Sequence, residues 1–343
     1  MHINIAKINF EPIGINIAKV DFGLYDVANY KDEYLTLSVL GDGEITITIP
    51  EGINSSYATS ISYSKDKSTW NETLIDNTKQ TITIPVTSGE NVYLKGIAKQ
   101  LSNSTEGVIN STVNIVASGN IMSLLYGDDY KDKVTFQSGS SYTLAGLFKD
   151  NSHLINVDNL ILPAMTLSEK CYYNMFSGCT SLTTAPELPA TALYVNCYQS
   201  MFQDCTSLTA APELPATSLG VGCYANMFQG CTSLTTAPEL PATTLADNCY
   251  TSMFSGCTSL TTAPELHATT LVVGCYSYML SNCRKLNHIT MLATDISAES
   301  CLNNWVGGVS STGTFIKAAE MTSLPTGNNG IPSGWTVVDY GAA

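Results

Sequence analysis

The cysteines of this chain recur at a fixed spacing, and that spacing constrains the fold more than any other feature. Every step within each of two series is 26 residues. The first series is Cys171, Cys197, Cys223, Cys249, Cys275 and Cys301, and the second is Cys179, Cys205, Cys231, Cys257 and Cys283. A constant period of this length is typical of stacked repeats, in which each unit buries its apolar face against the next.

The repeating unit reads C-Y-x-x-M-F-x-x-C-T-S-L-T-x-A-P-E-L-P-A-T-x-L, with a degraded copy from Cys275 and an earlier copy from Tyr142 to Leu167. Its apolar positions at offsets 0, 4, 5, 8 and 11 fall on one face of a helix with 3.6 residues per turn. The following segment, 182–188, contains Pro186 and is expected to be a short, irregular strand. Each coil is therefore predicted to hold one short helix and one short strand.

Identical residues of successive coils are expected to form ladders in the core, such as Met175 with Met201 and Leu182 with Leu208. Burial of each such side chain contributes roughly 1.5 to 3 kcal/mol before the loss of conformational entropy is subtracted. A single coil is therefore not expected to be stable without its neighbours.

The run Met175-Phe176-x-x-Cys179-x-x-Leu182 resembles the hallmark motif of the BspA-like leucine-rich repeats of Bacteroides-type bacteria and their phages. The resemblance covers roughly residues 140–310. It implies a leucine-rich-repeat solenoid, and a role in adhesion and in host or matrix recognition.

The region before the repeats has a different pattern. Short alternating segments between Tyr34 and Val116 are separated by turn residues, as in Gly41-Asp42-Gly43, and predict a β-sandwich of immunoglobulin-like class with Trp70 in its core. The expected fold is thus mixed β plus α/β solenoid. Its predicted parts are an N-terminal arm (1–30), the sandwich (31–118), a linker (119–138), the solenoid (139–302) and a C-terminal cap (303–343) with Trp305, Phe315, Ile331 and Trp335.

The N-terminal arm repeats itself, since residues 3–10 read INIAKINF and residues 15–22 read INIAKVDF. We expect an attachment or oligomerisation element there, and padding of the next domain is an equal alternative. The first residues do not resemble a signal peptide. No run of the sequence approaches the ~18 to 20 apolar residues that cross a bilayer, so membrane insertion is not expected.

The charge of the chain argues against nucleic acid as a partner. Asp plus Glu number 29 against 15 for Lys plus Arg, and Arg284 is the only arginine. Phosphate recognition needs clustered cations, and the bidentate guanidinium fork is almost absent here.

Catalytic and metal chemistry find little support in the sequence. The cysteines lack CxxC spacing and are expected to be buried free thiols. The four histidines, His2, His153, His267 and His288, lie in no metal or triad motif. Residues 128–132 (DDYKD) could bind calcium, but a solvated linker is favoured over a loop without ordered oxygen spacing. We therefore expect no enzyme, no cofactor and no metal.

The most suggestive surface feature is a row of threonines and glutamates expected on the strand side of the repeats. The predicted ligand-binding residues are Thr183, Glu187, Thr209, Glu213, Thr235, Glu239, Thr261 and Glu265. Like charges about 5 Å apart in water repel by roughly 0.8 kcal/mol per pair, which bound cations or a basic partner would reverse. The alternative is a screened, solvated ladder produced by duplication of the repeat.

These observations favour a non-enzymatic recognition or structural protein. The leading hypothesis is a bacteriophage fibre or decoration protein on the virion surface, which binds a host cell-surface glycan or protein and forms a homo-oligomer or larger virion assembly through residues 1–30. The alternative is a bacterial cell-surface or extracellular adhesin that binds a host matrix protein or glycan. A third class, an enzyme with a cryptic site, would require a deep pocket with perturbed carboxylates.

Overall fold

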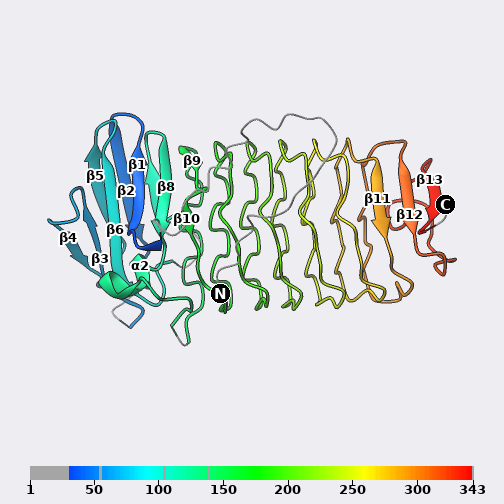
Figure 1. Cartoon of the computed structure of the whole chain (residues 1–343), viewed down its shortest axis with the longest axis horizontal. Helices are drawn as coiled ribbons and strands as arrows, with labels where there is room; N and C mark the ends of the chain where they lie inside the picture. Colours follow the sequence, from blue (N-terminus) through cyan, green and yellow to red (C-terminus); the bar gives the residue numbers. More distant parts are fainter. Residues whose placement is uncertain (1–30, 54–55, 103–105, 138, 342–343) are drawn as a thin grey trace, which may run out of the picture.

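The computed structural model describes residues 31–341 except 54–55, 103–105 and 138. The molecule is elongated, with most of its β-strands at one end and a series of similar layers along the rest of its length (Figure 1). Three further strands, β11 (His288–Met291), β12 (Thr314–Lys317) and β13 (Thr336–Asp339), lie near the C-terminal end of this series.

The N-terminal strands form two sheets. Their bounds are β1 (Leu35–Val39), β2 (Gly43–Ile49), β3 (Ala58–Ser64), β4 (Asn71–Leu74), β5 (Gln80–Val86), β6 (Asn91–Ala98), β7 (Ile109–Ser111) and β8 (Ile115–Asn120). Strands β5, β2 and β7 form the smaller sheet, and the larger one runs β10-β8-β1-β6-β3-β4. Alternation explains the burial, since Ile45, Ile47 and Ile49 of β2 are fully buried while the threonines between them are partly exposed.

The larger sheet continues directly into the repeats. Strands β9 (Leu154–Asn156) and β10 (Leu160–Ile161) belong to the earliest repeat, and both pair in parallel with β8. A short helix, α2 (Ser123–Tyr126), and the 3₁₀ turn η1 (Gly127–Asp129) follow β8. The repeats therefore stack against a sheet edge whose backbone groups are already aligned to receive them.

We call each 26-residue unit from Cys171 onward a layer: 171–196, 197–222, 223–248, 249–274 and 275–300. The first part of a layer consists of successive tight turns. The amides of Tyr173, Met175, Ser177 and Cys179 each donate to the carbonyl three residues earlier, at 3.0 to 3.2 Å. The amides between them, of Tyr172, Asn174, Phe176 and Gly178, donate to the next layer at 2.8 to 3.0 Å. Half of the amides thus close turns and half join layers.

Residues with a left-handed backbone conformation explain why this segment is not an α-helix. A positive φ recurs every four residues, at 170, 174 and 178 along the first turn segment and at 196, 200 and 204 along the second. An α-helix requires negative φ throughout. The residues in these places are mainly Asn, Gly, Ser and Asp, which adopt the left-handed conformation more readily than most. The predicted helix of each coil is therefore wrong.

The strand predicted in each coil is also absent from most of the repeats. No strand is formed in the four A-P-E-L segments around Glu187, Glu213, Glu239 and Glu265, and the backbone there is extended without regular pairing. Proline has no amide hydrogen to donate to a ladder, and two prolines flank three of these four glutamates. Where the prolines are lost, in His288–Met291, strand β11 forms and pairs with β12.

Side chains of successive layers lie directly over one another. The rings of Tyr172, Tyr198, Tyr224, Tyr250 and Tyr276 are buried and stacked, and so are those of Phe148, Phe176, Phe202, Phe228 and Phe254. Between layers their centroids lie 5.4 to 6.1 Å apart. The methionine and leucine positions of each layer are fully buried as well. These ladders form the core that the spacing predicted.

The second cysteine of each layer satisfies a carbonyl of an earlier one. The thiols of Cys179, Cys205, Cys231, Cys257 and Cys283 donate to the carbonyls of Phe148, Phe176, Phe202, Phe228 and Phe254 at 3.0 to 3.1 Å. All eleven cysteines are buried and free. A small side chain with a weak donor therefore suits this position.

Aromatic residues follow the last tyrosine of the stack. The Trp305 ring lies against Tyr276 and meets Phe315 edge to face, and its indole nitrogen donates to the Gly330 carbonyl at 2.9 Å. Trp335 is also buried and donates to the Ser310 carbonyl at 2.7 Å. The residues expected in the C-terminal cap thus cover the end of the tyrosine ladder, while the predicted domain boundaries stay predictions.

The expected fold class as a whole is wrong. The regular secondary structure of the described part is mainly β-strand in several sheets, with one four-residue α-helix, and the leucine-rich α/β solenoid is not formed. The strands of the predicted sandwich do form two antiparallel sheets, but parallel pairs of β8 with β9 and β10 extend the larger sheet into the earliest repeat, so it is not a self-contained immunoglobulin-like sandwich. Trp70 is not a core residue either. It is half-buried, with its ring edge against Tyr34 and Lys95 Nζ 4.2 Å from its centroid.

Two glycines with nearly equal φ provide a matched test of the layer contacts. Gly230 has φ 75° and Gly256 has φ 77°. A Cβ on Gly230 would lie 2.2 Å from Asp204 Oδ1 of the preceding layer, whereas one on Gly256 would meet only Gly230 at 3.7 Å. We expect Gly256→Ala to lose roughly 1 to 2 kcal/mol through backbone strain alone. Gly230→Ala should melt lower still, as measured by circular dichroism, because the exposed Asp204 carboxylate must then move aside.

The added loss in Gly230→Ala should disappear when Asp204→Gly removes the carboxylate, because Asp204 itself has a positive φ that glycine accepts. Equal melting temperatures for the two single variants would show that the Asp204 carboxylate is not fixed beside Gly230.

Candidate ligand-binding groove

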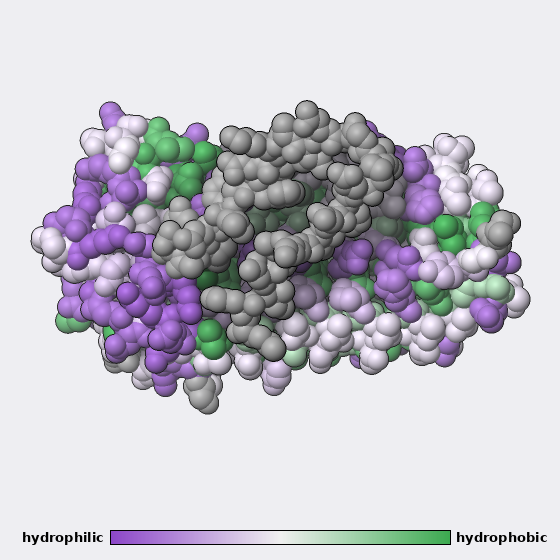
Figure 2. Space-filling model, in the orientation of Figure 1, coloured by the Kyte–Doolittle hydropathy of each residue, from purple (hydrophilic) through white to green (hydrophobic). Residues whose placement is uncertain are grey.

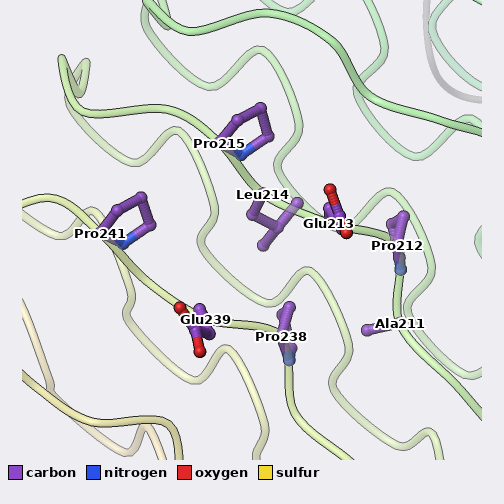
Figure 3. A pocket seen from close by; sticks show the side chains of 8 residues that line it. All are labelled: Ala211, Pro212, Glu213, Leu214, Pro215, Pro238, Glu239 and Pro241. Atoms are coloured by element: carbon purple, nitrogen blue, oxygen red, sulfur yellow. The ribbon is translucent and has the colours of Figure 1, made fainter. Parts of the chain in front are cut away.

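The proline-rich segments of neighbouring layers enclose a groove (Figure 3). One cavity of about 420 Å³ lies between Pro212–Pro215 and Pro238–Pro241, and another of about 420 Å³ lies between Pro186–Pro189 and Pro212–Pro215. The two share Pro212, Glu213 and Pro215. They are therefore consecutive stretches of one groove that crosses three layers.

The groove extends toward the N-terminal strands. A smaller cavity of about 90 Å³ is lined by residues 158–163 together with Glu187 and Pro189. Because Glu187 and Pro189 also line the neighbouring cavity, the groove reaches from the β10 region to Pro241 without a break in its lining.

Each layer contributes the same side chains to this groove. Figure 3 shows Pro212 and Pro238 in one row and Pro215 and Pro241 in another, with a glutamate of each layer between the rows. The rings provide aliphatic surface, and leucines 188, 214 and 240 are buried beneath the segments. Glu187, Glu213 and Glu239 are exposed. The arrangement can bind an extended ligand by apolar contact at its sides and by charge along its middle.

The three layers that line the groove contain no lysine or arginine to balance these carboxylates. Between residues 171 and 283 the sequence contains no lysine or arginine, and its acidic residues are Glu187, Asp204, Glu213, Glu239, Asp247 and Glu265. In Figure 2 strongly hydrophilic residues gather over the N-terminal strands, whereas much of the uncovered lower edge of the layers has intermediate hydropathy. Within the described ranges, no ion pair involves Glu187, Glu213 or Glu239.

The fourth glutamate of the row has a different environment. Glu265 Oε1 lies 3.5 Å from His267 Nδ1, at the place where the other layers have proline. A hydrogen bond with Glu265 also raises the pKa of Tyr340 above its usual value. Glu265 lines neither of the large cavities. Glu265 thus lies outside the two large cavities and close to His267 and Tyr340 of the same chain.

The predicted ligand-binding residues fall into two groups, because the glutamates lie in the groove and the threonines do not. Glu187, Glu213 and Glu239 line the groove, whereas the threonines are exposed but do not line it. The Thr183 hydroxyl donates to the Ile155 carbonyl at 2.9 Å, and that of Thr235 donates to the Thr209 carbonyl at 3.4 Å. These hydroxyls connect layers. The sequence analysis missed the prolines as lining residues, although the repeated P-E-L-P already placed them on both sides of each glutamate.

The acidic segment 128–132 was considered as a calcium site, but its side chains contact other residues of the protein. Asp128 accepts hydrogen bonds from Tyr34 Oη at 2.7 Å and from Lys95 Nζ at 2.9 Å, and these two donors lower the pKa of its carboxyl. Tyr130 is buried, and its hydroxyl donates to the Asp32 carbonyl. Among the described residues, no group of three or more His, Cys, Asp or Glu side chains could hold a metal ion.

His267 and His288 lie in two adjacent layers, His153 precedes the first layer, and His2 lies outside the described residues. In the described part of the chain, none of the helices has the length and apolar character to span a membrane.

Comparison with known proteins identifies no relative: no protein-family model matches the sequence, and no characterised protein or solved structure is significantly similar to it. The resemblance to BspA-like repeats therefore stays a prediction from the motif alone.

The cysteine thiols should react only slowly with thiol reagents in the folded protein. Burial raises the pKa of Cys171 and Cys283 to about 12 and raises that of the other cysteines in the same direction. A raised pKa keeps the thiol neutral at pH 8, and the thiolate is the nucleophile. We expect a chromogenic disulfide reagent to react slowly with the native protein and rapidly with all eleven thiols after unfolding. Fast reaction of even one thiol in the native state would contradict this burial.

Proposed function

We propose that this protein is a non-enzymatic recognition protein that binds an extended, repeating ligand on a cell surface along the proline–glutamate groove. The observation that carries the proposal is the continuity of that groove: three successive layers present the same prolines and the same carboxylate at regular intervals. A lining that repeats with each layer suits a ligand that repeats as well. A host glycan chain or an extended protein segment meets this requirement.

The shape of the groove supports binding over catalysis. Its carboxylates are exposed, and a catalytic acid or base normally needs a perturbed environment. Binding through several equivalent contacts gains from multivalency, since each further contact forms within a complex that already exists.

Glu213 offers the sharpest test because it lines both large cavities. We expect Glu213→Lys to weaken binding to the target cells or to an arrayed glycan by at least about tenfold, as a central contact of an interface should. The matched control is Asp247→Lys, which makes the same change of charge at an exposed position outside the groove. Equal loss in both variants, or loss in neither, would remove the groove from the function.

We further propose that the protein belongs to a virion fibre or decoration, with residues 1–30 as its attachment to the assembly. The support is the duplicated apolar motif INIAK in that segment, which lies outside the described residues.

Light scattering tests the assembly role. We expect the full chain, of 36.7 kDa, to have a solution mass that is a multiple of this value. A chain that starts at Tyr30 should be a monomer. Monomers in both cases would contradict the virion proposal and favour a bacterial adhesin instead.

A further inference from the structure

The stack of layers ends in a strand whose outer edge is open. Strand β13 pairs with β12 alone, in parallel, and lies at the C-terminal end of the molecule (Figure 1). The amides of Thr336 and Tyr340 donate toward β12, to the carbonyls of residues 313 and 317, at 2.9 and 2.7 Å. Amides alternate in direction along a strand, so those of residues 337 and 339 point away from β12, and no described residue pairs with them. The end of the stack can therefore receive one more parallel strand.

Little protects this edge. Edge strands are commonly blocked by a proline, a lysine or a bulge. The sequence of β13 is TVVD, and its register with β12 runs over all four residues without a shift. Val337 is 43% exposed, whereas Phe315 and Ile289, its register partners in β12 and β11, are fully buried. An apolar row that is buried in two strands is thus left uncovered at the third.

The contacts between β12 and β13 show which neighbour suits this edge. Phe315 lies beside Val337. Lys317 lies beside Asp339 and donates a hydrogen bond to its carboxylate. Strand β12 therefore offers β13 an apolar residue and, two positions later, a cation. The Asp339 side chain is 50% exposed, so its carboxylate is open to a second cation from the outer side.

The same pattern occurs twice in the N-terminal arm. Residues 15–19 read INIAK, with Ile17 and Lys19 two positions apart, and residues 3–7 repeat the same letters. Both segments lie outside the described residues. The order is that of Phe-Ile-Lys in β12, an apolar residue followed two positions later by a lysine.

This order also selects the direction of an added strand. A parallel strand that places Ile17 beside Val337 places Lys19 beside Asp339. An antiparallel strand with Ile17 beside Val337 would place Ile15, not a lysine, beside the carboxylate. Parallel addition is therefore the arrangement that supplies both contacts, and it continues the pairing already present between β12 and β13.

Chain length favours the arm of a second copy. The arm leaves the described structure at Lys31, whose carbonyl accepts a hydrogen bond from Asn120 at the end of β8. The earliest repeat, the five layers and β12 lie between β8 and β13. At one strand spacing or more for each, a strand added to β13 lies on the order of 45 Å from β8. Residues 20–30 span at most about 40 Å when fully extended. The INIAK motif at 15–19 thus falls short of β13 in its own chain.

We propose that residues 15–19 of one copy add to the outer edge of β13 of a second copy as a parallel strand. Ile17 then extends the apolar row beside Val337. Lys19 pairs with Asp339 from the side opposite the β12 lysine. Each copy offers an arm at one end and an open edge at the other, so the contact joins copies head to tail in a linear fibre. The inference rests on the attachment role proposed for the N-terminal arm and names the surface that receives it.

Engineered cysteines in the full chain test the register. With Ile17→Cys and Val337→Cys together, mild oxidation should join copies into disulfide-linked multimers on a non-reducing gel. The native cysteines are buried and should not contribute. The matched control combines Ile17→Cys with Thr336→Cys, whose side chain faces the other side of the sheet, and should give at least about tenfold less cross-linked product. Equal cross-linking by the two pairs, or a disulfide confined to one chain, would overturn the proposal.

Light scattering on the full chain provides a second test. Val337→Pro removes an amide that points away from β12, and proline is tolerated at such a position of an edge strand. Its melting curve should match that of the parent chain, and its assembly should require at least about tenfold more protein because one intermolecular hydrogen bond and the fit of the added strand are lost. If removal of the arm gives a monomer while Val337→Pro assembles normally and the cysteine pairs do not cross-link, the arm keeps its proposed role and β13 does not receive it. A monomeric full chain contradicts both proposals.

Discussion

The whole stack depends on which carbonyl groups its backbone amides donate to. Within the turn segment of each layer, alternate amides close turns in their own layer and the others donate to carbonyls of the next layer. A layer without its neighbour would leave half of these amides without a protein partner, and an unpaired buried amide costs as much as a lost hydrogen bond. Each end of the stack therefore needs another partner. At one end the amides of Leu101, Val108 and Ile109 donate to carbonyls of the earliest turn segment and β8 pairs with β9 and β10. At the other end Trp305 and the strands β12 and β13 cover the stack.

The same division accounts for the groove. The turn segments hold the layers at a fixed distance, so the proline-rich segments need not pair with one another. A regular strand at these places would align flat edges and fill the space between layers with backbone hydrogen bonds. Proline prevents this because it lacks the donor. What remains is a set of extended segments whose rings stand apart and enclose cavities of about 420 Å³.

The buried ladders could be predicted from the sequence. The turns in each layer were also encoded there, but their pattern was interpreted as a helix. The 26-residue period identified the buried ladders correctly, because identical side chains in a stack must meet. The offsets 0, 4, 5, 8 and 11 suggested a helix, but an apolar face every four residues is equally compatible with repeated four-residue turns. The deciding signal was the recurrence of Asn, Gly, Ser and Asp at places such as 174, 178, 200 and 204, which favour positive φ. The threonine hydroxyls could not be assigned from sequence, since their acceptors lie in other layers.

The groove glutamates repeat for a different reason from the core residues. A core position must repeat, because each side chain packs on its counterpart in the adjacent layer. An exposed position need not, and the equivalent exposed residues Ala192, Ser218 and Thr244 differ from layer to layer. The exposed Glu187, Glu213 and Glu239 are nevertheless identical, although like charges at this spacing repel. Packing does not require this identity, whereas a ligand that meets every layer with the same chemical group would.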